Sequence, residues 1–127
     1  MPIWNIVHLD FQNQMMMPVI YQLCDVFVLP STGPGESWGL SINEAMAAGK
    51  VVIASDRCGG AIDLIIKGEN GYIFKAGNVD DLILKMKNLF CKQNQMKEMN
   101  ASSILKIQQF TFEKYMIAVE NLVDSNG

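Results

Sequence analysis

Two carboxylates in one glycine-rich segment are the residues of this chain best suited to chemistry. Glu36 and Glu44 stand eight positions apart, and Gly33, Gly35 and Gly39 surround the first of them. An ionised carboxylate only accepts hydrogen bonds, and two neighbouring sugar hydroxyls can donate two to it. Glycines let a ligand approach the backbone closely. Glu36, Glu44 and Gly35 are therefore predicted to contact a ligand that carries paired hydroxyls.

A helix is predicted to begin directly after this loop. The first amides of a helix have no partner within it, and together with the helix dipole they favour an anion such as a diphosphate. These amides belong to Gly39, Leu40 and Ser41, which lie between the two glutamates. An anion site between two hydroxyl-binding carboxylates describes a sugar nucleotide. From the spacing alone, an exposed loop carboxylate and a solvated helix charge are an equal alternative.

A glycine pair, Gly59 and Gly60, follows a second apolar run. A tight turn is the simplest explanation of such a pair. Its position at the carboxyl end of a predicted strand favours a donor-site loop, because ligands of parallel sheets bind beyond those ends. Asp56 and Arg57 in the same loop are either a surface pair or residues that reach the site, and the sequence leaves both open.

Other candidate residues have simpler explanations. The single histidine, His8, is predicted to be a strand residue, because no Ser or Cys nucleophile with an orienting partner is evident. Asp80 and Asp81 resemble part of a metal site, but two acidic residues in the first turn of a helix are explained by the helix dipole. No metal site is predicted.

The elements that must position these residues alternate along the chain. Continuous apolar runs, typical of strands covered on both faces, predict strands over residues 25–30, 51–54 and 71–74, with 6–9 as a candidate earlier one. Helical spacing predicts helices over residues 17–24 and 39–48, and one that Asn78 caps. After Asn94 the chain is predicted to form two helices, the second capped by Thr111. The predicted fold is α/β, a Rossmann-like parallel sheet with helices on both faces and a helical C-terminus.

The composition of the chain argues against several classes of partner and site. The 127 residues are half apolar, with a net charge of −3 and no cluster of Lys or Arg, which argues against a nucleic-acid partner. Three widely spaced cysteines indicate neither a zinc site nor a disulfide framework. No signal peptide or membrane span is evident, so the chain is expected to be cytoplasmic, with membrane association possible for a longer enzyme.

The sequence around the two glutamates resembles a known family. It is similar to the Glu-x7-Glu signature of retaining GT-B glycosyltransferases related to glycogen synthases and bacterial mannosyltransferases. The similarity extends through Tyr21-Gln22-Leu23-Cys24-Asp25-Val26-Phe27-Val28-Leu29-Pro30-Ser31, Glu44-Ala45-Met46-Ala47-Ala48-Gly49, Val51-Val52, Gly59-Gly60 and Asn70-Gly71-Tyr72. The family commonly has Gly-Phe where Ser37-Trp38 stand and Pro where Lys50 stands. Roughly the whole chain from Asn5 onward fits in order.

The resemblance implies a nucleotide-sugar donor, carrying UDP, GDP or ADP, and transfer of its sugar with retention of configuration. Glu36 would contact the donor sugar as the catalytic glutamate, Glu44 the ribose, and the amides of Gly39 and Leu40 the phosphate or sugar, with no metal required. The resemblance also implies that residues 1–127 are one partial domain, the donor half, without the acceptor-binding half. The isolated chain is then expected to transfer no sugar, and its exposed surfaces allow self-association. A non-catalytic, receiver-like nucleotide module and a nucleotide-sugar epimerase fragment are the alternatives.

Overall fold

Three parallel strands form the centre of the molecule. The computed structural model describes residues 8–10, 15–32 and 40–126. Strands β1 (Val26–Leu29), β2 (Val51–Ser55) and β3 (Gly71–Phe74) pair in the order β1-β2-β3. Parallel pairing brings their carboxyl ends to the same edge of the sheet. The three predicted strands are confirmed.

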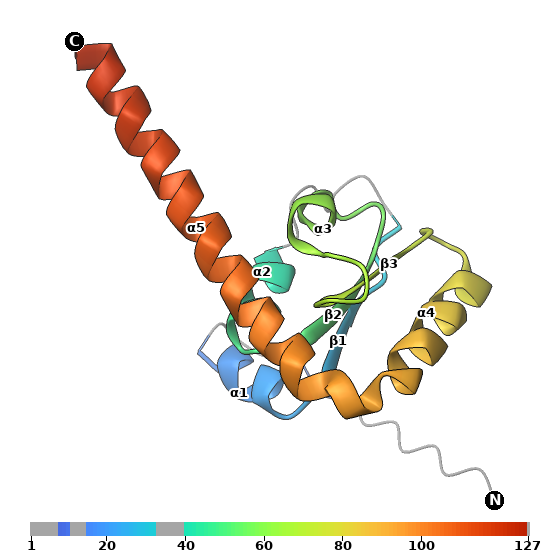
Figure 1. Ribbon diagram of the computed structural model, residues 1–127. Coiled ribbons are helices and arrows are strands. Elements are labelled where there is room, and N and C mark those ends of the chain that lie inside the picture. The colour runs from blue at the N-terminus through green and yellow to red at the C-terminus, as the bar shows by residue number, and fades with distance from the viewer. Residues whose placement is uncertain (1–7, 11–14, 33–39, 127) are drawn as a thin grey trace, which may run out of the picture.

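Helices cover both faces of this sheet (Figure 1). Successive residues of a strand point to opposite faces. Accordingly, Val52 and Ala54 pack with α1 (Met17–Gln22), α2 (Leu40–Ala47) and α3 (Gly59–Leu64). On the other face, Val51 and Ile53 pack with Leu89 of α4 (Val79–Cys91). Every residue of β2 is buried, which agrees with the continuous apolar run over residues 51–54.

Local sequence signals fix the ends of the helices. Pro18 occupies the first turn of α1, where its missing N–H costs nothing. The Asn78 side chain accepts a hydrogen bond from the Asp81 amide, so the predicted cap of α4 is confirmed. Helix α2 ends where Gly49 adopts φ +78, and the amides of Gly49 and Lys50 donate to the carbonyls of Met46 and Ala45.

Close backbone contact in the sheet requires a glycine in β3. Gly71 pairs with Val52 of β2, and any Cβ at position 71 would overlap the Val52 carbonyl group. The preceding turn is closed by the buried side chain of Asn70. Its amide oxygen accepts from the Ile66 N–H at 2.8 Å, and its amide nitrogen donates to the Leu64 carbonyl at 2.9 Å. Asn70 thereby ties the end of α3 to the start of β3.

The C-terminal prediction of two helices is wrong. After the short 3-10 helix η1 (Gln93–Gln95), one helix, α5 (Met96–Asn126), runs without interruption through Thr111. No Gly or Pro occurs between Met96 and Asn126, so nothing in the backbone ends the first half of this helix. Thr111 is a helix-interior residue rather than a cap.

Two further predictions differ from the structure. Gly59 and Gly60 are the first residues of α3, not a loop or a tight turn, because Ala61 and Leu64 of this short helix are buried in the core. His8 and Leu9 do not belong to a strand, and residues 6–7 of the same candidate strand lie outside the described residues.

Helix α5 extends well beyond the α/β body (Figure 1). Its first half packs on the sheet layers, with Met99 in the core of one face and Ile107 in the core of the other. Among the described residues, no helix combines the length and the apolar character needed to cross a membrane.

Candidate functional site

One buried hydroxyl joins the carboxyl ends of β1 and β2. The side chain of Ser55 is fully buried, and its Oγ donates to the backbone carbonyl of Ser31 at 2.6 Å. The same oxygen accepts from the backbone N–H of Arg57 at 3.3 Å. Ser31 begins the segment that leads to Glu36, and Arg57 leads into α3. Ser55 therefore fixes the starting points of these two segments relative to each other.

The predicted site residues fall into two groups in the structure. Leu40, Ser41 and Glu44 lie on α2, and Gly59 and Gly60 begin α3. Both helices start at the carboxyl edge of the sheet and contact each other, so the fold brings these two groups together. The remaining predicted site residues lie outside the described residues: Glu36, Gly35 and Gly39.

Glu44 has a specific partner that the prediction did not include. The hydroxyl of Tyr21, on α1, donates to Oε2 of Glu44 at 3.0 Å. Tyr21 is only 3% exposed, and its ring packs edge-on against Phe27 of β1 with 5.4 Å between ring centroids. Glu44 itself is half-buried. A carboxylate on an alanine-rich helix face is thus compensated by a hydrogen bond from a fixed side chain.

The environment of Tyr21 keeps its hydroxyl protonated. Burial, then the hydrogen bond to Glu44 and its negative charge, raise the pKa of Tyr21 to about 12. The nearby hydroxyl of Ser41 acts in the opposite direction and lowers this pKa. Ser41 and Glu44 stand one helical turn apart on α2, so both flank the same phenol. At neutral pH the phenol is therefore a neutral donor toward Glu44.

A cavity of about 530 Å³ lies beside this pair. It opens between α1 and α2 and is lined by the side of α2 that carries Glu44. Its lining residues are Pro18, Tyr21, Gln22, Glu44, Ala47 and Ala48. Its charged group among these is Glu44, whose carboxylate can accept hydrogen bonds from a polar ligand there.

The structure resolves the question left open for Asp56. Its carboxylate Oδ1 accepts from the Ala76 N–H at 3.0 Å, while its backbone N–H donates to the Phe74 carbonyl at 2.9 Å. These contacts tie the end of β2 to the end of β3. Asp56 therefore holds the edge of the sheet together, whereas the Arg57 side chain is exposed.

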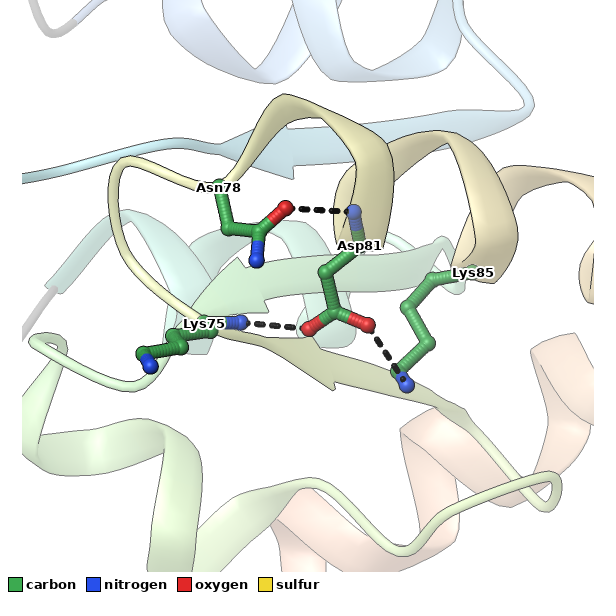
Figure 2. A network of polar contacts seen from close by, with 4 residues as sticks. All are labelled: Lys75, Asn78, Asp81 and Lys85. Carbon is green, nitrogen blue, oxygen red and sulfur yellow. Dashed lines mark hydrogen bonds and ion pairs between the residues drawn. The ribbon is translucent and has the colours of Figure 1, made fainter.

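In the acidic pair at the start of α4, Asp81 has a structural role. Figure 2 shows that the Asp81 carboxylate accepts from the Lys75 backbone N–H at 2.7 Å and from Lys85 Nζ at 3.1 Å. The Lys75 hydrogen bond, followed by that of Lys85, lowers the pKa of Asp81. Across the described residues, no group of three or more His, Cys, Asp or Glu side chains gathers as a metal site would require.

Comparison with known proteins assigns this chain to a family. The family model described as Glycosyl transferases group 1 matches residues 4–105, which include both glutamates and all three strands. The chain belongs to this family. The curated sulfoquinovosyl transferase SQD2 of Arabidopsis thaliana is 40% identical over 72 residues, which cover 54% of this chain and 14% of SQD2.

Solved structures of glycosyltransferases share the fold of this group 1 chain. HepE of Anabaena, solved in complex with UDP, superposes with a TM-score of 0.66 and 24% identity over 80% of this chain and 29% of its own. The C-terminal domain of the group 1 protein LpcC of Francisella tularensis gives a TM-score of 0.66 and 23% identity over 79% of this chain and 50% of its own. The fold is thus that of the C-terminal, Rossmann-like domain of a GT-B glycosyltransferase, and the chain spans less than a third of SQD2 and of HepE.

The sequence did not predict one residue of the candidate site, Tyr21. Tyr21 is part of the family resemblance but has no predicted role, because it precedes β1 whereas the Glu-x7-Glu signature follows β1. The available signal was its position: an aromatic residue with a polar end, five residues before the first residue of β1. Nothing in that signal named Glu44 as its partner.

Proposed function

We propose that this chain is the donor-binding half of a retaining glycosyltransferase and that it binds a nucleoside diphosphate sugar. Glu44 accepts hydrogen bonds from the ribose hydroxyls, and Glu36 contacts the donor sugar. The amides of Gly39, Leu40 and Ser41 face the diphosphate at the start of α2. Gly35 and Gly59 allow the ligand to approach the backbone closely, whereas Gly60 is buried within α3.

The observation that carries this proposal is the position of Glu44. It lies on the helix that follows β1, beside a cavity of about 530 Å³, and one of its two oxygens is held by Tyr21. The second oxygen has capacity to accept hydrogen bonds from a ligand. Family membership and a fold shared with UDP-bound HepE support the choice of a nucleotide sugar.

The chemistry assigned to this half is stabilisation of the leaving group. When the glycosidic bond to the donor phosphate breaks, negative charge develops on the departing nucleoside diphosphate. The free amides and the dipole at the start of α2 favour that charge, without a metal ion. The acceptor is bound by another part of the enzyme, so we propose that residues 1–127 alone bind the donor and transfer no sugar.

The test is calorimetric titration of the chain with UDP, GDP and ADP and with their glucose conjugates. We expect one nucleotide series to bind, and Glu44→Ala to weaken it about 10- to 100-fold, as loss of hydrogen bonds to a charged group predicts. Glu120→Ala, which removes the same charge from an exposed position of α5, is the matched control and should leave binding unchanged.

Other outcomes identify other functions. If no nucleotide binds, the donor-site proposal for this chain is wrong. Binding that is indifferent to Glu44→Ala would favour a nucleotide module of a different kind, such as a receiver-like domain. Turnover by a longer enzyme without any acceptor would favour an epimerase, and sugar transfer by the isolated chain would contradict its assignment as a half-enzyme.

A further inference from the structure

The contact between Tyr21 and Glu44 joins two helices that are separated by β1. The two residues are 23 positions apart, yet the phenol oxygen and the carboxylate Oε2 are 3.0 Å from each other. Tyr21 cannot easily shift, because its ring is buried against Phe27 and its carbonyl accepts from both the amide and the thiol of Cys24. Of the two partners, the tyrosine is therefore the fixed one.

Glu44 needs such an anchor if it is to bind a ligand well. A free glutamate side chain loses rotamer freedom when it is ordered, and this loss of entropy opposes binding. A hydrogen bond already present in the unliganded protein removes part of this cost from the binding step. The phenol binds only one oxygen, so the carboxylate still has a second oxygen for a ligand.

We infer that Tyr21 is a positioning residue, whose hydroxyl holds Oε2 of Glu44 so that Oε1 is presented to the paired ribose hydroxyls of the donor nucleotide. This inference rests on the proposed function. Ser41 supports the arrangement, because its hydroxyl lies close enough to Tyr21 to affect the titration of the phenol. Tyr21 also lines the cavity beside Glu44, so it forms part of the wall along which the nucleoside lies.

A purely structural role for the same hydrogen bond makes different predictions. If Tyr21 only attaches α1 to α2, its loss affects stability and affects every ligand equally. If it positions Glu44 for ribose, its loss weakens ribonucleotides specifically and only when Glu44 is present. The 2′-deoxynucleotide lacks one of the paired hydroxyls and provides the comparison.

The experiment measures dissociation constants of UDP, GDP and ADP and of their 2′-deoxy forms. The proteins are the wild type, Tyr21→Phe, Glu44→Ala and the double variant, each with its free energy of unfolding from urea denaturation. We expect Tyr21→Phe to weaken the preferred ribonucleotide about three- to tenfold, as loss of one hydrogen bond predicts. The deoxy form should change by less than about twofold, and the effect should vanish in the Glu44→Ala background.

Tyr72→Phe is the matched control. Tyr72 is buried to the same extent, at 3% exposure, but lies in the core on the opposite face of the sheet. Its substitution should leave all dissociation constants unchanged. A second readout needs no ligand. NMR titration of labelled tyrosines should give a lower pKa for Tyr21 in Glu44→Ala than the value of about 12 in the wild type, since a hydrogen bond and a negative charge are lost.

The outcomes separate this inference from the proposed function. If the wild type binds and Glu44→Ala weakens binding but Tyr21→Phe does not, the positioning role is wrong and the donor site stands. Equal weakening of ribo- and deoxynucleotides by Tyr21→Phe would show a general packing effect and also overturn the positioning role. If the wild type binds none of the nucleotides, both proposals fail together.

Discussion

At the scale of single residues, buried hydrogen bonds set the geometry of the carboxyl edge of the sheet. Ser55 is the clearest case, because one buried oxygen serves both the Ser31 carbonyl and the Arg57 amide. We predict that Ser55→Ala lowers the free energy of unfolding by about 1–3 kcal/mol, since it removes two hydrogen bonds made by a buried hydroxyl. Urea denaturation checks this value. Ser31→Ala is the control: the contact uses the backbone of Ser31, so a loss as large as that of Ser55→Ala would contradict the explanation.

At the scale of elements, the start of α4 shows how a helix end depends on charge (Figure 2). The pKa of Asp81 is lowered in the folded state, so its stabilising effect is present above its unfolded pKa of about 3.9 and is lost as the pH falls through the lower folded value. We predict that Asp81→Asn unfolds more easily than the wild type at pH 7, and that the two stabilities converge below about pH 4. Thermal unfolding between pH 2 and pH 7 measures this.

The neighbouring carboxylate is the control for that prediction. Asp80 lies in the same first turn of α4 and experiences the same helix dipole, but it is exposed. Asp80→Asn should change the acid limb of the stability curve much less than Asp81→Asn does. Equal effects of the two substitutions would show that the dipole, rather than the contacts with Lys75 and Lys85, accounts for the pH dependence.

At the scale of the whole molecule, the second half of α5 lies outside the packed body. The described side chains from Thr111 to Asp124 are all exposed, and among them Phe112, Met116, Val119 and Val123 repeat at intervals of four, three and four. Such an apolar stripe can pair with the same stripe of a second copy, in line with the expected self-association of the chain. The full chain should therefore sediment as a dimer, and a chain that ends after Phe112 as a monomer, at the same concentration.

The same truncation should leave the body almost intact. Ile107 and Phe110 are the last residues of α5 that pack against the core, and both are retained. We expect the free energy of unfolding of the truncated monomer to lie within about 1 kcal/mol of that of the full chain at low concentration, since exposed side chains contribute little. A monomeric full chain would contradict the pairing, and a large loss of stability would contradict the described packing.

The sequence by itself determined the elements that local signals encode. Apolar runs gave three strands, Asn78 gave the start of α4, and the order of strands and helices gave a parallel sheet with helices on both faces. These features depend on periodicity and on side chain to backbone contacts within a few residues, which can be read along a chain. The same reading placed Ser41 and Glu44 on a helix at the carboxyl edge of the sheet.

Only the tertiary structure decided which side chains meet. It made α3 helical despite two glycines, because the buried contacts of Ala61 and Leu64 outweigh a poor local propensity. It continued α5 through Thr111, and it brought Tyr21 to Glu44 and Ser55 to Ser31 across more than twenty residues of chain. Such contacts depend on how helices pack on a sheet and not on the spacing of the residues involved. The sequence therefore predicts Glu44 as a site residue, whereas the contact that orients its carboxylate is a property of the folded chain.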